Sequence, residues 1–184
     1  MRKLLNRELG RKSIEEYRNS EKSSTVIVLD NVRSHSNVGS VFRTADAFLT
    51  KKIYLCGITA KPPHRDIQKT ALGATESVEW SHHESTLDVA RQLKAEGYKI
   101  IGIEQTEGSV GLQNINIKKG EKYALIFGHE VNGVDQKVID FCDMCVEIPQ
   151  FGIKHSFNIA VSAGIVLWEM NRGVACNAPT DIIY

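Results

Sequence analysis

The chain has 184 residues, of which 42% are hydrophobic and 24% are charged, and its formal net charge is +1 at pH 7. The length predicts one domain with a sizeable core, and the composition is that of an ordinary globular protein. The longest apolar run, residues 159–168, is far too short to span a bilayer, and the first residues contain no apolar signal region. These features argue against a membrane protein, and we expect a cytoplasmic one.

The first 22 residues are more basic than the rest of the chain. They contain seven Lys or Arg and four Asp or Glu residues, a charge of +3, which leaves 16 basic against 18 acidic residues, or −2, for the remainder. A sparse apolar side predicts a helix over residues 2–21, formed by Leu4, Leu5, Leu9, Ile14 and Tyr17. We therefore predict a basic helical extension at 1–22 and a main domain at 23–184. The extension suits a polyanionic partner, although a solvated charged helix has the same pattern.

Continuous apolar runs of the kind found in buried parallel strands recur along the chain. They lie at residues 25–29, 52–58, 98–104, 123–127 and 145–148, and a further short strand is expected at 77–80. Helical patterns fall between them at 37–49, 85–96, 135–141 and 158–171, with Gly97 ending the second and Gly173 the last. Strands that alternate with helices predict an α/β fold with a parallel sheet and helices on both faces.

The helix predicted at 37–49 has one apolar face and one arginine well away from it. The apolar positions are Val38, Val41, Phe42, Ala45, Phe48 and Leu49. Gly39 lies four residues before Arg43 on the same flank, which leaves room for a bulky partner against the backbone. A guanidinium can hold a phosphate in a bidentate fork. The alternative is an exposed arginine beside a tolerated glycine.

Three later stretches carry polar groups next to predicted strands. Residues 61–69 form a basic, proline-containing loop after a strand, where open α/β sheets place ligands, although an ordinary surface loop is the alternative. Gly128 follows another strand, and Glu130 could orient a substrate or hold its own loop by accepting backbone N–H groups. Ser156 and Asn158 are good helix caps between a loop shaped by proline and glycine and an apolar helix.

Cys142 and Cys145 form a single C-x-x-C pair. A zinc site would need further ligands at a suitable spacing, and a redox pair would begin a helix after a strand. Neither pattern is present, so two ordinary thiols in a reducing compartment are the better interpretation. We predict no metal.

Three stretches resemble the three motifs of the SpoU-type (TrmH-like) RNA 2′-O-ribose methyltransferases, a family of the SPOUT class. The sequence NVG at 37–39 followed by Arg43 resembles the first motif. The sequence FGHE at 127–130 followed by Gly133 resembles the second, and residues 146–170 resemble the third. The order and the separations also fit the family.

The resemblance implies a C-terminal trefoil knot, S-adenosylmethionine as the cofactor and specific residue roles. It implies catalytic roles for Arg43, Glu130, Ser156 and Asn158. It implies cofactor contacts from Ile103, Glu104, Gly128, Ile148 and Phe157. It implies substrate contacts from Asn37, Gly39, Arg65 and Lys69.

Two positions depart from the family pattern. Phe157 stands where the family often has leucine, which keeps an apolar wall, whereas His155 stands where it often has glutamate, which changes the local charge.

We therefore predict a methyltransferase that uses S-adenosylmethionine to methylate a ribose 2′-hydroxyl of RNA. The expected substrate is tRNA, because no separate rRNA-binding domain precedes the motifs, and rRNA is the alternative. A homodimer is expected, because the family draws each active site from two chains. A non-catalytic RNA-binding module on the same scaffold is the competing class. A Rossmann-type nucleotide enzyme fits less well, since no G-x-G-x-x-G follows the first strand.

Overall fold

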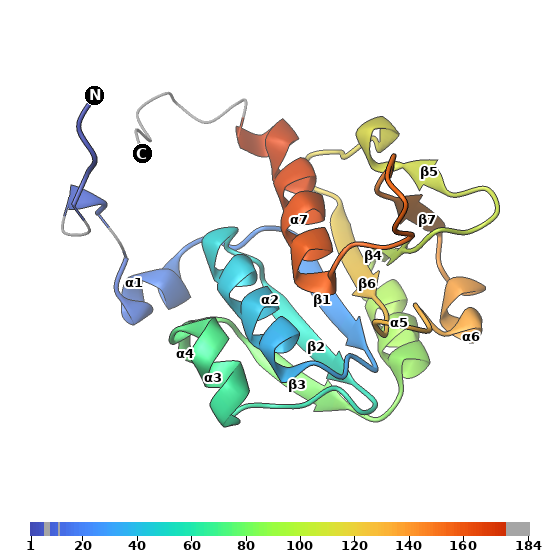
Figure 1. Ribbon diagram of the computed structural model, residues 1–184, viewed down its shortest axis with the longest axis horizontal. Helices are drawn as coiled ribbons and strands as arrows, with labels where there is room; N and C mark the ends of the chain where they lie inside the picture. Colours follow the sequence, from blue (N-terminus) through green and yellow to red (C-terminus); the bar gives the residue numbers. More distant parts are fainter. Residues whose placement is uncertain (6–7, 11, 176–184) are drawn as a thin grey trace.

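One parallel sheet of seven strands lies at the centre of the computed structural model, which describes residues 1–5, 8–10 and 12–175 (Figure 1). The strand order is β3-β2-β1-β6-β4-β7-β5, and each neighbouring pair is parallel. The strands are β1 (Thr25–Asp30), β2 (Lys52–Cys56), β3 (Trp80–His83), β4 (Tyr98–Ile103), β5 (Val110–Gly111), β6 (Lys122–Phe127) and β7 (Met144–Glu147). The predicted parallel sheet is confirmed.

Helices cover both faces of this sheet, as predicted. One face carries α1 (Ile14–Asn19), α2 (His35–Ala47), α3 (Arg65–Ala71), α4 (Ala74–Ser77) and α7 (Ile159–Ala175), and the other carries α5 (Thr86–Ala95) and α6 (Gln136–Ile139). A short 3-10 helix, η2 (Leu112–Asn114), follows β5. Alternate residues of a strand point to opposite faces, so Ile27 and Leu29 pack in the first layer while Val26 and Val28 pack in the second. None of the helices in these described segments has both the length and the apolar character that crossing a membrane takes.

The late strands lie between earlier ones. β6 separates β1 from β4, β7 separates β4 from β5, and α7 then packs against α2. This order is consistent with the predicted trefoil knot, which stays a prediction. The order also gathers the carboxyl ends of β4, β6 and β7 at one edge of the sheet.

Two local predictions in the first half of the domain are wrong. The loop predicted at 61–69 contains the start of α3, because the His64 Nδ1 atom accepts the Asp66 N–H at 3.2 Å and caps a helix that buries Ile67. The strand predicted at 77–80 begins only at Trp80, because residues 74–77 form α4. Both helices are too short to show a clear apolar periodicity in the sequence. The first follows two prolines, and the second consists mostly of small residues.

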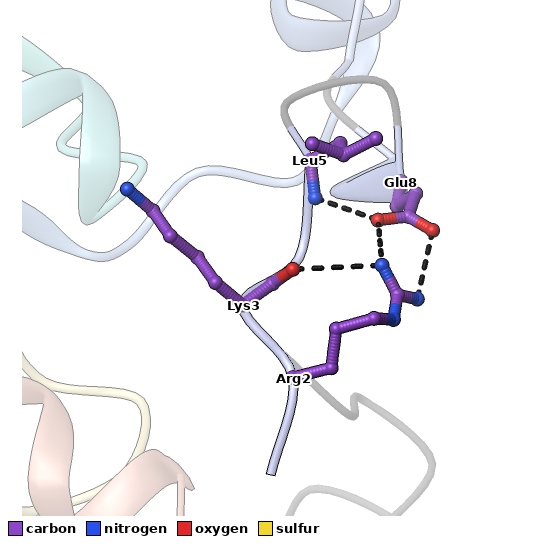
Figure 2. A network of polar contacts seen from close by, with 4 residues as sticks. All are labelled: Arg2, Lys3, Leu5 and Glu8. Atoms are coloured by element: carbon purple, nitrogen blue, oxygen red, sulfur yellow. Dashed lines mark hydrogen bonds and ion pairs between the residues drawn. The ribbon is translucent and has the colours of Figure 1, made fainter.

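The ends of the chain also differ from their predictions. In the described part of residues 2–21, the expected α-helix is present only as α1, which begins at the capping box of Ser13 and Glu16 and buries Tyr17. Before it, Arg2 and Glu8 form an exposed ion pair, and Glu8 also accepts the Leu5 N–H at 2.6 Å (Figure 2). At the other end α7 continues through Gly173, so the predicted helix stop there is wrong.

Gly39 lets α2 and α3 pack closely. A Cβ atom on Gly39 would lie 2.3 Å from the Ile67 carbonyl oxygen and 2.1 Å from the Thr70 hydroxyl oxygen. The expectation that Gly39 leaves room for a bulky ligand is therefore wrong, because α3 occupies that room. The glycine positions α3 instead.

Substituting Gly39 with alanine is therefore predicted to destabilise the fold. The clash is expected to cost about 1–3 kcal/mol of the free energy of unfolding, since a backbone carbonyl must move. The matched control is Gly164→Ala in α7, where the nearest atom to the new Cβ is a Thr44 methyl carbon at 4.0 Å. That control should be neutral or gain up to about 1 kcal/mol from helix propensity. Urea unfolding at one protein concentration measures both, and equal midpoints for the two variants would contradict the packing role.

Candidate functional site

A cavity of about 540 Å³ opens where β4, β6 and β7 end. Its volume lies in the range of small-molecule sites, and open α/β sheets bind ligands at this edge. Apolar side chains from all three strand ends and from the start of α7 line it, namely Ile103, Phe127, Ile148, Phe157 and Ile159. The cavity can therefore take a ligand with a flat apolar portion.

Eight of the residues predicted for the site line this one cavity. They are Ile103, Glu104, Gly128, Glu130, Ile148, Ser156, Phe157 and Asn158. These residues are spread over 56 positions of the chain, from 103 to 158, so the fold brings distant motifs together. Asn37 joins them through hydrogen bonds to Glu130 and Asn158.

Glu130 connects the second motif to the first. Its carboxylate accepts the backbone N–H groups of Arg33 and Ser34 at 3.1 and 3.0 Å, and the Asn37 Nδ2 at 3.0 Å. Desolvation by partial burial raises the pKa of Glu130, but these donors outweigh it and hold the pKa below its ordinary value. Of the two roles considered for Glu130, the structure contains the hydrogen bonds of a loop-holding carboxylate.

Asn37 and Asn158 connect the first motif to the third. The Asn158 Nδ2 donates to the Asn37 Oδ1 at 2.9 Å, and the Asn158 Oδ1 accepts the Ala160 N–H at 2.9 Å. Asn158 therefore caps α7 while it binds α2, as its residue type predicted. One chain of hydrogen bonds now runs through Glu130, Asn37 and Asn158, which come from three separate segments.

Gly128 and Glu104 shape the floor of the cavity. A Cβ atom on Gly128 would lie 2.1 Å from the Gly133 carbonyl carbon, so only glycine allows the 129–133 turn to fold back so closely. The turn is closed by two backbone hydrogen bonds between His129 and Gly133. Glu104 supports it from β4, because one carboxylate oxygen accepts the Val134 N–H at 3.0 Å.

The loop between β7 and α7 covers one side of the cavity and is held by glutamine side chains. The Gln105 Nε2 donates to the His155 carbonyl oxygen at 2.8 Å, and the Gln150 Nε2 donates to the same oxygen at 3.3 Å. Both glutamines line the cavity. Gln105 belongs to residues 103–106, which resemble a cofactor-contacting strand end of the family, whereas Gln150 was not predicted to have a role.

Three of the predicted cationic residues lie outside the cavity. Arg43, Arg65 and Lys69 are exposed on α2 and α3 and are not among the cavity residues. Arg43 follows Asn37 by six residues on α2, or about 9 Å along the helix axis. Within the described part of the chain none of the three forms an ion pair. Each is therefore free to bind an anion.

The charges that line the cavity are acidic. Glu104, Glu130 and Glu147 contribute carboxylates, and the lining residues include no lysine or arginine. Such a lining favours a ligand that carries a positive charge.

The C-x-x-C pair lies away from this cavity. The Sγ atoms of Cys142 and Cys145 both lie beside Gly102, whose missing side chain makes room for them. Burial raises the pKa of the Cys142 thiol to about 12, which makes it a poor nucleophile at neutral pH. No group of three potential metal ligands occurs within residues 1–5, 8–10 and 12–175. Cys176 lies outside the described residues.

Comparison with known proteins places these features in a family. The profile of the SpoU rRNA Methylase family matches residues 24–168. A 23S rRNA (guanosine-2′-O-)-methyltransferase of Neisseria meningitidis is 32% identical over 80% of this chain and 58% of its own length. A tRNA (guanosine(18)-2′-O)-methyltransferase of Borreliella burgdorferi is 26% identical over 85% of this chain and 70% of its own length.

Solved structures agree with this placement. An rRNA methyltransferase from Sinorhizobium meliloti with bound AdoMet is 28% identical and superimposes with a TM-score of 0.78, over 86% of this chain and 60% of that one. A TrmH/SpoU tRNA modifying enzyme from A. aeolicus has the same fold, with 21% identity, a TM-score of 0.78 and coverage of 88% and 82%. The chain thus spans somewhat more than half the length of the Neisseria and Sinorhizobium proteins.

Glu130→Gln tests the hydrogen-bond network. The substitution places an NH₂ group against backbone N–H donors, so the variant should lose on the order of 1 kcal/mol of unfolding free energy at pH 7, a modest figure because Glu130 is largely exposed. The wild-type advantage should be complete above the ordinary glutamate pKa of about 4.3 and vanish as the pH falls through the lowered folded pKa. Urea unfolding of both proteins across this pH range measures the difference. A constant difference down to low pH would contradict the role of the ionised carboxylate.

Proposed function

The chain belongs to the SpoU rRNA Methylase family, and from that premise we propose that it transfers a methyl group from S-adenosylmethionine to a ribose 2′-hydroxyl of RNA. One observation carries the proposal: residues from three separate motifs converge on a single cavity and are joined by the Glu130–Asn37–Asn158 hydrogen bonds. The named relatives that share this region are RNA 2′-O-methyltransferases, and the Sinorhizobium structure contains AdoMet.

The cavity fits S-adenosylmethionine. Ile103, Ile148 and Phe157 provide apolar walls for an adenine ring, and the acidic lining suits the positive sulfonium. When bound, the cofactor supplies a methyl group that is already activated by its charge. The polar backbone of the 128–133 turn and of the 149–158 loop can bind the remaining polar groups.

The residues of the chain then have two tasks. They must align the ribose oxygen with the methyl group, and they must stabilise the negative charge that develops on that oxygen. We assign alignment to Asn158 and Ser156 at the cavity mouth, with Glu130 and Asn37 holding the first of them in position. Ser156 is exposed and could donate its hydroxyl proton to a substrate oxygen.

Arg43 is assigned the role of a charged clamp. It would bind the phosphate beside the target ribose and stabilise the forming alkoxide, because a guanidinium stays protonated in proteins. Acting as a base near pH 7 would cost on the order of 7 kcal/mol or more. The proton of the hydroxyl would leave to a neighbouring group or to water.

We propose that Arg43 acts in the cavity of a second copy of the chain. It is exposed on α2 and is not among the residues that line the cavity of its own chain. Phe151 and Ile153 of the loop beside the cavity are 98% and 91% exposed, and Trp168 of α7 is 58% exposed, which is apolar surface that dimerisation would bury. We therefore propose a homodimer in which one subunit binds the cofactor and its partner supplies Arg43.

The proposed substrate class is tRNA. The Borreliella relative is named as a tRNA methyltransferase and the Neisseria relative as an rRNA methyltransferase, so both substrate classes occur among the similar proteins. A methyltransferase for rRNA is the alternative. The basic segment at 1–22 is proposed to add phosphate contacts, and a cytoplasmic location stays a prediction.

A mixing experiment tests the proposed chemistry and the shared site together. Ile148→Asp replaces part of the apolar wall proposed for the adenine ring with a carboxylate that must be desolvated when the ring binds, so it should weaken S-adenosylmethionine binding by tenfold or more, about 1.4 kcal/mol. Ile58→Asp is the matched control, because Ile58 is exposed outside the cavity. Arg43→Ala should bind the cofactor normally but lose roughly a hundredfold in rate, as the loss of one transition-state donor does. Isothermal titration and single-turnover methylation of bulk tRNA measure these effects.

At a cofactor concentration too low for Ile148→Asp to bind it, both variants should be nearly inactive, and they should restore each other if the site is shared. In an equimolar mixture, about half of the dimers are mixed, and each has one intact site, so activity should return to about a quarter of wild type. No recovery in a mixture that light scattering shows to be dimeric would contradict the shared site. If the wild type shows no saturable binding of S-adenosylmethionine, the proposal that the chain is a methyltransferase is contradicted.

A further inference from the structure

Two histidines stack on each other beside the mouth of the cavity. The rings of His35 and His64 lie 3.9 Å apart between centroids with an interplanar angle of 28°. His35 is the first residue of α2, and His64 immediately precedes α3. The two residues are far apart in sequence, so the packing of α2 against α3 brings them together.

The ring of His64 is held by a hydrogen bond, and His35 follows a residue whose backbone is bound. The His64 Nδ1 accepts the Asp66 N–H at 3.2 Å, which fixes the position of that ring. His35 follows Ser34, whose backbone N–H is bound by the Glu130 carboxylate at 3.0 Å. Glu130 lines the cavity. His35 therefore directly follows, in sequence, a residue that is hydrogen-bonded to the network of the site.

The surroundings of the pair are exposed and basic. His64 is exposed and His35 is half-buried, so the pair presents imidazole surface to solvent. Arg33 lies two residues before His35, and Arg65 directly follows His64. Lys61 lies three residues before His64, and Lys69 lies on α3. All four are exposed. Within the described segments these four cations form no ion pair, whereas Lys52, Arg91, Lys94, Lys99 and Arg172 do. The four cations outnumber the two carboxylates next to the pair, those of Asp66 and Glu130.

We propose that the stacked imidazoles of His35 and His64 form a platform for an unpaired nucleobase of the RNA next to the target ribose. Unstacked bases bind to histidine and other aromatic rings through their faces, and neighbouring cations hold the phosphates. The exposed Arg33 and Arg65, close to the two histidines in sequence, supply such cations. This inference rests on the proposed function, because it assumes that RNA approaches the cavity.

The platform predicts a base-dependent part of RNA affinity that is separate from the phosphate-dependent part. Stacking contributes about 1–3 kcal/mol per base, so its loss should weaken binding about 5- to 150-fold. Phosphate contacts should be unaffected, and the slope of affinity against salt should stay the same. Loss of an arginine near the platform should instead flatten the slope of affinity against salt and leave the base-dependent part unchanged.

Substitutions can distinguish base stacking by the His64 ring from the role of its Nδ1 atom in capping α3. His64→Asn removes the ring but keeps an acceptor for the Asp66 N–H, since asparagine is a good N-cap. His35→Ala removes the other ring, and His35→Phe restores an aromatic face. Arg65→Ala is the control for a phosphate contact. Thermal unfolding of each variant reports any loss of structure.

The probes are a short mixed-sequence single-stranded oligoribonucleotide and an abasic strand of the same length. Fluorescence anisotropy across a salt series gives the affinity for each. His64→Asn and His35→Ala should weaken binding of the base-containing strand alone, and His35→Phe should restore it. Arg65→Ala should weaken both strands and flatten the salt slope.

Three other outcomes are distinguishable. If the wild type binds neither strand nor bulk tRNA, the proposed RNA function fails. If the wild type binds both strands and the histidine variants bind the base-containing strand as tightly as the wild type, the platform is overturned while the function stands. If the variants lower the unfolding temperature without changing affinity, the stack is structural only and the inference is also overturned.

Discussion

The structure of this site depends on one carboxylate. Glu130 accepts two backbone N–H groups from the loop before α2 and the side-chain amide of Asn37, which in turn accepts from Asn158. These few hydrogen bonds join segments that are about a hundred residues apart in sequence. Glu130 is largely exposed, so each of these bonds contributes only modestly, but removing the carboxylate affects all three segments at once.

The sheet order explains why a single carboxylate can do this. Parallel strands place all their carboxyl ends at one edge, and the insertion of β6 beside β1 brings Glu130, shortly after β6, next to the loop that leaves β1. The late insertion of β7 then delivers the loop that leads to α7. Topology thus positions the motifs, and hydrogen bonds fix their side chains.

The strong periodic patterns in the sequence predicted most of the fold, and the motif residues predicted most of the cavity wall. What could not be predicted depends on contacts between distant segments. Gly39 looked like space for a ligand, yet only the position of α3 shows that Ile67 fills it. His64 caps α3 and stacks on His35. Neither contact produces a periodic pattern in the sequence, so neither could be predicted from it. Arg43 was predicted from its motif, but only the structure shows that it does not line the cavity of its own chain.

The position of the transferred methyl group tests the account most directly. Bulk tRNA would be incubated with the protein and S-adenosylmethionine labelled in its methyl group, and the RNA would then be hydrolysed in alkali. A methyl group on the ribose 2′-oxygen blocks the attack that cleaves the adjacent phosphodiester, so the account predicts label in alkali-resistant dinucleotides. Label in single nucleotides that carry a methylated base would contradict the proposed ribose chemistry.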